Sequence, residues 1–371
     1  MASYWLSEPC PARPAAVVDN PDVVVIGGGV TGCSTALHLA QAGLKIRLCE
    51  AREIASGASG RNGGFALRGG AMPFDAAVRD FGAGPALAFW RATEDALSWL
   101  AELAGDAFRP VGSYRLAVDE AEAAELRREV EALQAAGLEA EWLKSLPEHL
   151  ASRYVAGFRH PPDGALQPAR WVRRLAGHAA SAGVEIREHE RIASVAGLAP
   201  QVVIATDGYG AGLLPELDEA IRPTRGQVVA TEPLDEMLYP FPHYARHGYD
   251  YWHQLPDLRL VFGGHRDASL ETEWTDVEET TPVVQRHIDD AIEGLLGFRP
   301  PVAVRWSGVW GTTRDDRPLV GELPGRPGVW VAAGYSGHGN VMGLMCGRLV
   351  ARAIMGDRDT LLDLFSPARP L

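Results

Sequence analysis

The chain has 371 residues, of which 46% are hydrophobic and 22% are charged. This composition is typical of a globular protein, and the length predicts two structural domains. The formal net charge of −13 argues against nucleic acid or an anionic membrane surface as a partner, because both are negatively charged.

The four cysteines lie far apart and lack the Cys-x-x-Cys or Cys/His spacing of a structural metal site. We therefore expect no metal and a reducing compartment. No segment is long and apolar enough to span a bilayer, and the acidic, Pro-rich start does not have the pattern of a signal peptide. These features predict a soluble, cytoplasmic protein and leave its oligomeric state open.

The first predicted elements are a strand, a glycine turn, a helix and a second strand. A Pro-rich tail over 1–20, which its aromatic residues should pin to the protein, precedes the strand at 22–26. The helix is expected over 31–41 and the next strand over 45–49. Such a βαβ unit requires parallel strands covered on both faces, so we predict an α/β, Rossmann-like fold.

The next part of the chain favours a different kind of domain. Helical patterns over 85–103 and 119–136 flank a strand at 114–118, which indicates a cap domain. Residues 222–304 contain strand-like runs, such as 227–231, separated by turn residues. These runs predict an antiparallel sheet with one solvated face in the second domain.

Other segments return the chain to the first sheet. A helix is predicted over 168–182, followed by strands at 184–187 and 201–204. The last segment repeats the opening order, with a strand at 329–333, a glycine-rich turn and a helix over 341–355.

A glycine triplet, Gly27-x-Gly29-x-x-Gly32, lies between the first strand and its helix. The first glycine makes the turn, the second admits a pyrophosphate, and the third lets helix and strand approach. Glu50 follows at the end of the second strand, where its carboxylate can accept hydrogen bonds from an adenosine ribose. The pattern favours FAD or NAD over NADP; the alternative, a glycine turn without a ligand, conflicts with the complete βαβ context.

A second glycine-rich segment, Ser56-Gly-Ala-Ser-Gly-Arg-Asn-Gly-Gly64, follows closely. Its backbone N–H groups, hydroxyls and Arg61 suit a position near the pyrophosphate and the flavin. Arg61 could bind pyrophosphate, order the loop or meet a substrate carboxylate, and ordering on the cofactor side is our first interpretation.

Together with the C-terminal Gly334-Tyr-Ser-Gly-His-Gly-Asn340, these motifs resemble the glycine oxidase/D-amino-acid oxidase (DAO) family of FAD-dependent enzymes. The branch that the chain most resembles is the gamma-glutamylputrescine oxidase-like one, and the resemblance covers nearly the whole chain. It implies hydride transfer to FAD from the carbon beside nitrogen in a small-molecule amine or amino-acid-like substrate. The resulting imine would hydrolyse to a carbonyl product, and oxygen or an electron carrier would reoxidise the flavin.

The resemblance also implies a discontinuous FAD-binding domain with the flavin buried against a second domain. We expect the first domain to comprise 1–75, 150–215 and 305–371. The substrate or cap domain, an α+β unit built on the antiparallel sheet, would comprise 76–149 and 216–304.

The residues that the motifs and the resemblance assign to FAD are Gly27, Gly29, Val30, Thr31, Gly32, Glu50, Ala51, Arg52, Ser56, Ala58, Ser59, Arg61, Asn62, Gly63, Gly64, Thr206, Gly208, Gly334, Tyr335, Ser336, Gly337, His338, Gly339 and Asn340. The candidates for a catalytic role are His338, Tyr251 and Trp310. For His338 a structural or flavin-contact role is preferred to that of a base.

Aromatic residues of the second domain offer a candidate amine pocket. Tyr249, Tyr251, Trp252 and Trp310 could hold a cation or exclude water from the flavin. Plain core packing explains each of them equally well.

The chain departs from the sarcosine oxidase branch of the family in ways that bear on function. No cysteine lies in 307–313, where that branch attaches its flavin, so we expect non-covalent FAD. Val341 replaces a lysine that meets the substrate carboxylate, which argues against a simple α-amino acid. Val261 replaces an oxygen-activating lysine, so the electron acceptor stays open. The segment 192–200 is short, which predicts a trimmed adenine side.

Two alternatives remain from the sequence. An NAD-dependent dehydrogenase would share the glycine triplet and Glu50 but would not explain the other two glycine-rich segments. A non-catalytic flavin-binding protein would explain the valines at positions 261 and 341.

Overall fold

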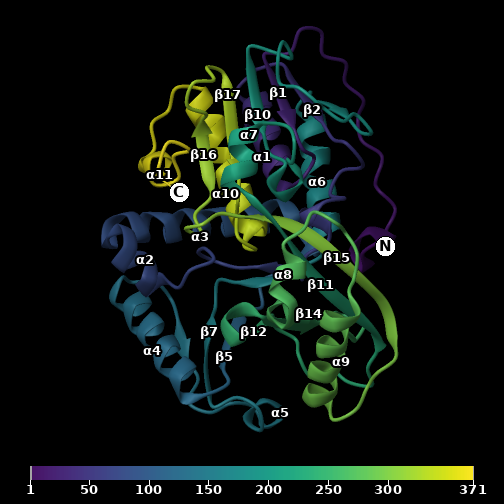
Figure 1. Ribbon diagram of the computed structural model, residues 1–371, viewed down its shortest axis with the longest axis vertical. Helices are drawn as coiled ribbons and strands as arrows, with labels where there is room; N and C mark the ends of the chain where they lie inside the picture. The colour runs from purple at the N-terminus through teal and green to yellow at the C-terminus, as the bar shows by residue number, and fades with distance from the viewer. Residues whose placement is uncertain (1, 371) are drawn as a thin grey trace.

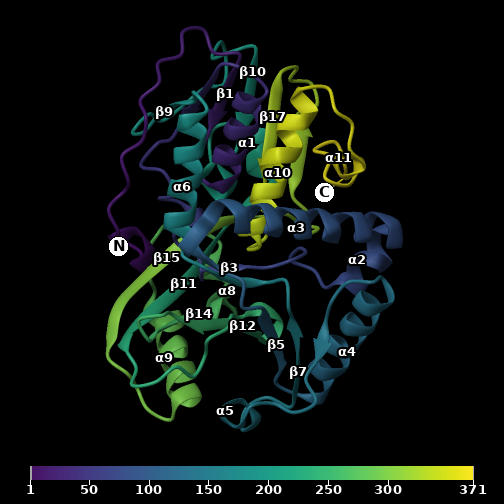
Figure 2. The ribbon, with the colours of Figure 1, turned by 180° about the vertical axis from the view of Figure 1, so that it is seen from behind.

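The computed structural model describes residues 2–370. Figures 1 and 2 show two regions, one around β1, β10 and β17 and the other around β5, β11 and β14, with α3 (Ala83–Ala104) running across their junction. Within the described residues, no helix is both long and apolar enough to cross a membrane.

The first region is built on a six-stranded sheet. In spatial order its strands are β16 (Leu319–Glu322), β17 (Val329–Ala333), β10 (Gln201–Ile204), β1 (Val23–Ile26), β2 (Ile46–Cys49) and β9 (Glu185–Arg187). All neighbouring pairs are parallel except β16 with β17. The predicted α/β class and parallel strands are therefore confirmed.

Both faces of this sheet are buried, because alternate side chains of β1 enter different cores. Val23 and Val25 pack with residues of α1 (Val30–Gln41) and α6 (Pro168–Ser181). Val24 and Ile26 pack with residues of α7 (Pro215–Ala220) and of the segment 192–199. That segment forms no strand, but its apolar side chains help to cover the sheet.

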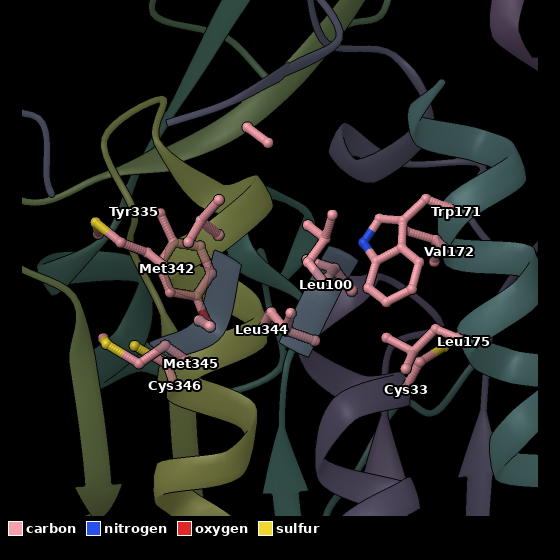
Figure 3. Close-up of a cluster of buried hydrophobic side chains, with 14 of the residues drawn as sticks. Cys33, Leu100, Trp171, Val172, Leu175, Tyr335, Met342, Leu344, Met345 and Cys346 are labelled. Atoms are coloured by element: carbon pink, nitrogen blue, oxygen red, sulfur yellow. The ribbon is translucent and has the colours of Figure 1, made fainter. Parts of the chain in front are cut away.

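The helices α1 and α10 (Gly339–Ile354) pack unusually closely. A Cβ atom at Gly347 would lie only 2.5 Å from the carbonyl oxygen of Thr31, so the contact requires glycine. Figure 3 shows the surrounding core, in which Leu100 of α3 lies between Leu344 of α10 and Trp171 of α6. This packing brings the first turns of α1 and α10 to the same edge of the sheet.

The second region is built on an eight-stranded sheet. Its spatial order is β15 (Val302–Thr312), β11 (Arg222–Pro233), β14 (Arg259–Gly264), β13 (Asp250–Gln254), β12 (His243–Ala245), β5 (Ser113–Ala117), β7 (Ala156–His160) and β6 (Glu141–Trp142). Only the β12–β5 pair is parallel among these described strands, which confirms the antiparallel prediction for 222–304.

The expected solvated face is wrong for β11, whose residues 224–231 are buried almost throughout. Val229 packs against α9 (Pro282–Leu296), whereas Val228 and Ala230 belong to the core shared with the first region. The strand is covered on both faces because it lies between α9 and the six-stranded sheet's helices and loops.

The smaller elements join these regions. A three-stranded sheet contains β3 (Phe65–Ala66), β8 (Gly164–Leu166) and β4 (Phe108–Arg109). The remaining helices are α2 (Phe74–Phe81), α4 (Glu120–Ala135), α5 (Glu148–Ala151), α8 (Leu270–Glu273) and α11 (Thr360–Leu364).

The predicted domain boundaries stay a prediction, but strand pairing departs from them in two places. β7 was expected in the first domain and β15 largely so, yet both pair in the eight-stranded sheet. In addition, α3 packs on α10 and α6 in one continuous core. Long-range pairing, which local periodicity does not report, decides these memberships.

The N-terminal tail is pinned, as its aromatic residues predicted. Trp5 is buried, and its Nε1 donates a hydrogen bond to the Asn62 carbonyl at 2.7 Å. Gln167 Nε2 donates to the Trp5 carbonyl at 3.2 Å. The tail therefore supports the glycine-rich loop that contains Asn62.

Candidate functional site

A cavity of about 410 Å³ opens between the two large sheets. From the first region it is lined at the carboxyl ends of β1, β10 and β17, the edge at which open parallel sheets bind ligands. From the second region it is lined by residues of β11 to β15. Its size falls within the range of about 300–1,000 Å³ that small-molecule sites span.

Two helix N-termini reach this cavity. Val30 and Thr31 of α1 and Gly339 to Val341 of α10 line it, and Thr31 Oγ1 is hydrogen-bonded to the Tyr335 hydroxyl at 2.9 Å. Neither N-capping residue closes its helix with a side-chain hydrogen bond. The positive ends of two helix dipoles therefore favour negative charge in the cavity.

The glycine triplet shapes the wall beside α1. Gly27 has a φ of 113°, and a Cβ atom at Gly32 would lie 1.9 Å from the Gly27 carbonyl oxygen. A Cβ atom at Gly29 would lie 2.9 Å from Ser59 Oγ, so a side chain there would narrow the space between turn and loop. Gly27 and Gly32 thus build the turn, while Gly29 lines the cavity.

The loop over 56–64 is fastened to α10 and β15. Asn62 and Asn340 exchange two side-chain hydrogen bonds, at 3.0 and 3.1 Å. Arg61 Nε donates to the Ser56 carbonyl at 2.7 Å, and its Nη1 donates to the Ser307 carbonyl at 3.2 Å. Arg61 therefore ties the loop to β15, and its preferred role on the cofactor side stays a prediction.

Glu50 lies at the end of β2 but outside the cavity lining. Its two carboxylate oxygens accept hydrogen bonds from the Gly28 and Arg52 backbone N–H groups at 2.7 and 2.8 Å. The Arg52 guanidinium turns to Glu278 instead of the cavity. The ribose contact of Glu50 and the cofactor contact of Arg52 stay predictions.

The structure brings most of the predicted site residues together. Those that line the cavity are Gly29, Val30, Thr31, Ala58, Ser59, Arg61, Asn62, Gly63, Tyr251, Trp310, Tyr335, Ser336, Gly337, His338, Gly339 and Asn340. Those outside its lining are Gly27, Gly32, Glu50, Ala51, Arg52, Ser56, Gly64, Thr206, Gly208 and Gly334.

Asp207 was missed by the sequence reasoning, although it stands between two predicted residues. Its carboxylate accepts backbone hydrogen bonds from Gly311 at 2.9 Å and from Gly334 at 2.8 Å, and it lines the cavity. Burial raises the pKa of Asp207, while these backbone bonds oppose the rise. A polar residue directly after a buried strand was the available signal.

Left-handed backbone gathers around the cavity. Asp207, Asp316 and Ser336 line it with φ values of 48°, 54° and 49°, a region that residues with a Cβ rarely adopt. Hydrogen bonds hold Ser336 there, because its N–H donates to the Gly311 carbonyl at 2.9 Å. Such strain is concentrated at functional sites in proteins.

His338 presents an uncharged ring to the cavity. Burial and the charge of Arg115 lower its pKa to about 4, and the Ser336 backbone offsets only part of this decrease. Neither ring nitrogen makes a well-formed hydrogen bond within residues 2–370. A neutral imidazole of such low pKa is a weak base at pH 7, which favours the contact role.

The aromatic candidates divide between cavity and core. Tyr249, Tyr251 and Trp310 line the cavity, whereas Trp252 is fully buried between His243 and Phe262. The pocket alternative is therefore wrong for Trp252. Successive residues of a strand point to opposite faces, so β13 directs Tyr251 to the cavity and Trp252 to the core.

Arg266 is the second functional candidate that sequence reasoning missed. It lines the cavity, with its guanidinium carbon 5.0 Å from the Tyr249 ring centroid and 5.9 Å from that of Trp310. Arg266 forms no ion pair with an acid in the described part of the chain. Its positive charge nevertheless acts to lower the pKa of Asp316, which burial raises. No local pattern marks it, because the pairing of β13 with β14 places it there.

The two valines differ in position. Val341 lines the cavity, but Val261 is buried away from it. The neighbouring Arg259 forms ion pairs with Glu232 and Asp257.

Comparisons with known proteins agree with this architecture. The family described as "DAO: FAD dependent oxidoreductase" matches residues 22–353. Sequence identity is 28% to the probable oxidoreductase OrdL of Haemophilus influenzae, over 95% of this chain and 86% of that protein. Sequence identity is also 28% to gamma-glutamylputrescine oxidoreductase of Escherichia coli, over 91% of this chain and 84% of that protein. Glycine oxidase from Geobacillus kaustophilus shares the fold, with a TM-score of 0.79 and 22% identity over 95% of this chain and 99% of that one. The chain belongs to the DAO family of FAD-dependent oxidoreductases.

Proposed function

We propose that this oxidoreductase oxidises the C–N bond of an amine or amino-acid derivative that also carries an anionic group. The observation that carries the proposal is Arg266, a cation without an ion pair among the described residues, which lines the same cavity as the glycine-rich motifs. The names of two relatives, gamma-glutamylputrescine oxidoreductase and glycine oxidase, support the amine class.

The residues of the cavity fit FAD. The glycine turn, the two helix N-termini and the unsatisfied imidazole of His338 offer close backbone approach, positive potential and a free hydrogen-bonding group. Gly29 to Thr31 and Ala58 to Gly63 would hold the pyrophosphate side, and Gly337 to Asn340 the flavin side. The NAD-dependent alternative is wrong, because the family uses FAD.

Bound FAD supplies the two-electron acceptor. The chain's own residues position the substrate and exclude water. The Tyr251 and Trp310 rings and Val341 make much of the surface apolar, and burial raises the pKa of Tyr251, which therefore stays protonated. An apolar wall lowers the pKa of a bound ammonium, so the amine can lose its proton without a dedicated base.

The oxidative step then needs only orientation. A hydride leaves the carbon beside nitrogen, and the nitrogen lone pair forms the C=N bond of an iminium product. Water adds to that product after release, and the C–N bond breaks to give a carbonyl compound and an amine or ammonia. His338 stays neutral throughout and contributes a hydrogen bond but no charge.

Arg266 would orient the substrate through its anionic group. A guanidinium binds a carboxylate with two parallel hydrogen bonds, and the aromatic rings beside Arg266 limit its motion. The anionic group of the substrate must reach Arg266 while its amine carbon reaches the flavin. The distance between these two groups of the substrate is therefore fixed. The absence of a cysteine from the described cavity lining supports non-covalent FAD.

The test is an anaerobic screen of the FAD-loaded protein by flavin absorbance. Each gamma-glutamyl amine, N-methyl amino acid and D-amino acid is paired with an analogue that lacks its carboxylate, and polyamines are added as amines that carry no carboxylate. We expect bleaching by a carboxylated member and a half-saturating concentration at least about tenfold higher for its analogue. Faster bleaching by the analogues without a carboxylate would contradict the anionic requirement. Readmitted air then shows whether oxygen is the acceptor.

A further inference from the structure

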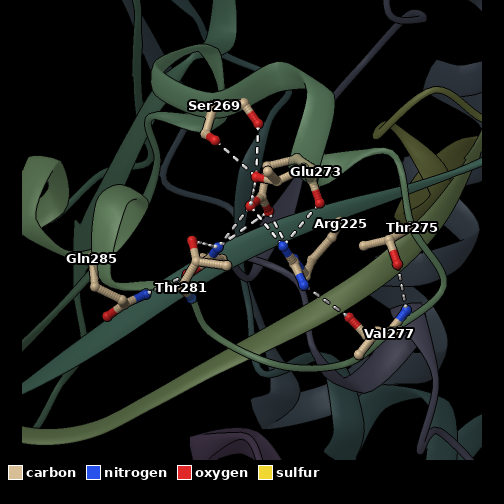
Figure 4. Close-up of polar contacts among 9 residues, drawn as sticks. Arg225, Ser269, Glu273, Thr275, Val277, Thr281 and Gln285 are labelled. Carbon is tan, nitrogen blue, oxygen red and sulfur yellow. Dashed lines mark hydrogen bonds and ion pairs between the residues drawn. The ribbon is translucent and has the colours of Figure 1, made fainter.

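The segment 273–281, called the strap below, links α8 to α9 in the second region. Its two ends are fixed to β11, as Figure 4 shows. Arg225 binds the Glu273 carboxylate with two hydrogen bonds of 2.8 Å, and Gln227 exchanges hydrogen bonds with Thr281 at 2.9 Å. Arg225 also donates to the Val277 carbonyl at 3.4 Å.

These anchors are buried, since Arg225 and Glu273 expose only 5% and 1% of their surface. A buried ion pair with further hydrogen bonds holds its groups in one geometry. The backbone of the strap is consequently fixed beside residue 278, and the Glu278 side chain extends from a rigid support.

Glu278 reaches across to the first region. Its carboxylate accepts hydrogen bonds from Arg52 Nη1 and Nη2 at 2.8 and 3.1 Å, and from the Tyr209 hydroxyl at 2.6 Å. Arg61 Nη2 lies 3.3 Å from it. Burial raises the pKa of Glu278, but the hydrogen bonds from Arg52 and Tyr209 outweigh it and lower the pKa overall.

The partners of Glu278 all belong to the cofactor side of the molecule. Arg52 follows Glu50 at the end of β2, and Arg61 lies in the glycine-rich loop that lines the cavity. The Tyr209 hydroxyl also accepts the Val309 N–H at 3.1 Å, and the Tyr209 ring lies against Gly57. Glu278 itself does not line the cavity, so it braces the outside of this wall instead of filling the space within.

We propose that Glu278 is a positioning residue that fastens the strap to the loop 56–64 and thereby slows the dissociation of FAD. The carboxylate joins groups that must separate before the loop can move away from the cavity. Most of this clamp is shielded from water, because Glu278 exposes only 17% of its side chain. The clamp acts on retention of the cofactor and is independent of which amine is oxidised.

The test compares Glu278→Gln with the matched control Glu279→Gln in the FAD-loaded enzyme. Glu279 is the exposed neighbour, whereas Arg52 and Tyr209 donate their hydrogen bonds to Glu278. The rate of FAD release into an excess of an apoprotein that binds FAD tightly is followed by fluorescence, alongside the thermal midpoint of each apoprotein. We expect release about tenfold faster for Glu278→Gln and unchanged for Glu279→Gln.

A second variant, Tyr209→Phe, removes only one of the hydrogen bonds to Glu278, together with the bond from the Val309 N–H, and keeps the carboxylate, so we expect a smaller increase in the release rate. It also serves if Glu278→Gln does not fold. An unchanged release rate in both variants would overturn the proposal. Slower release from Glu278→Gln would also overturn it, because it would mean that the carboxylate competes with the phosphates of FAD for Arg52 and Arg61.

Discussion

The two halves of the cavity are encoded in different ways. On the six-stranded side, the groups at the cavity come from short contiguous motifs, such as Gly27 to Gly32 and Gly334 to Asn340. On the eight-stranded side, Tyr244 and Tyr251 come from strands whose neighbours are set by pairing, and Arg266 follows directly after such a strand, β14. The first half is thus a local property of the sequence, and the second is a property of strand register.

The difference separates what is general from what is particular to this protein. The glycine turn works because backbone atoms must approach closely, which a few adjacent residues can guarantee. Substrate recognition depends on which face of β13 and β14 each side chain occupies. A change in the first half should therefore remove the cofactor, whereas a change in the second should alter stability or substrate preference.

The largest expected effect is that of Gly32→Val. A Cβ atom at residue 32 would collide with the Gly27 carbonyl oxygen at 1.9 Å, so the turn cannot form beside α1. We expect the variant to purify without FAD, as measured by its absorbance spectrum. Gly177→Ala is the control, because a Cβ atom at that helical position meets nothing within 4 Å. A yellow Gly32→Val protein would contradict the role of the turn.

The next prediction compares the stability effects of substitutions on the two faces of β13. Trp252→Ala should lower the free energy of unfolding by about 3–5 kcal/mol, because it empties a fully buried site. Tyr251→Phe should change it by less than about 0.5 kcal/mol, since only a cavity-facing hydroxyl is removed. Urea unfolding of both apoproteins measures the difference. Equal losses would show that the two side chains share one environment.

Stability should also fall as the pH drops below about 6.5. Burial lowers the pKa of His243 and His253 to about 3 and that of His265 and His338 to about 4, so these four rings take up protons only on unfolding. Burial raises the pKa of Asp163 and Asp250 to about 6, so these two groups have the opposite effect and stabilise the folded chain as the pH falls.

Among these six groups the histidines outnumber the aspartates by two, so near pH 5 these groups bind about two more protons in the unfolded chain. Their contribution to the free energy of unfolding should then fall by about 2–3 kcal/mol for each pH unit lost. Urea midpoints between pH 6 and pH 4.5 measure this slope. A flat or rising stability over that interval would show that the buried histidines are not neutral.

The smallest of these effects tests the proposed anion-binding role of Arg266 in the eight-stranded half of the cavity. Arg266→Gln should raise the half-saturating concentration of a carboxylated amine in flavin reduction about tenfold, with little change for an amine without a carboxylate. Arg259→Gln is the matched control, because its guanidinium is paired with Glu232 and Asp257. Equal effects of both variants, or of Arg266→Gln on both amines, would remove the anion-binding role.

The sequence was sufficient for much of the first half because each element there has a local signature. The strand 329–333 and the helices α1 and α6 agree with their predicted limits to within one residue. Local signatures did not predict which sheet contains β7 and β15. They also did not predict that β11 is buried on both faces or that Trp252 lies in the core. Each depends on partners in other parts of the chain or on a strand's phase relative to them.

The missed site residues follow the same rule. Asp207 has a local signal, a polar residue at the end of a buried strand, whereas Arg266 has none and is placed by the turn after β14. Glu50 and Arg52 lie outside the cavity lining, where backbone N–H groups bind the Glu50 carboxylate and Glu278 binds the Arg52 guanidinium. Local motifs indicate a cofactor well, but they do not specify which polar groups remain available to it.

The most direct test of the central claim is an anaerobic titration of the FAD-loaded wild-type protein with a carboxylated amine chosen from the screen. We predict that one equivalent of the amine bleaches one equivalent of oxidised flavin and yields one equivalent of a carbonyl product. Flavin that stays oxidised with every amine, or bleaches without loss of a C–N bond, would contradict the assignment.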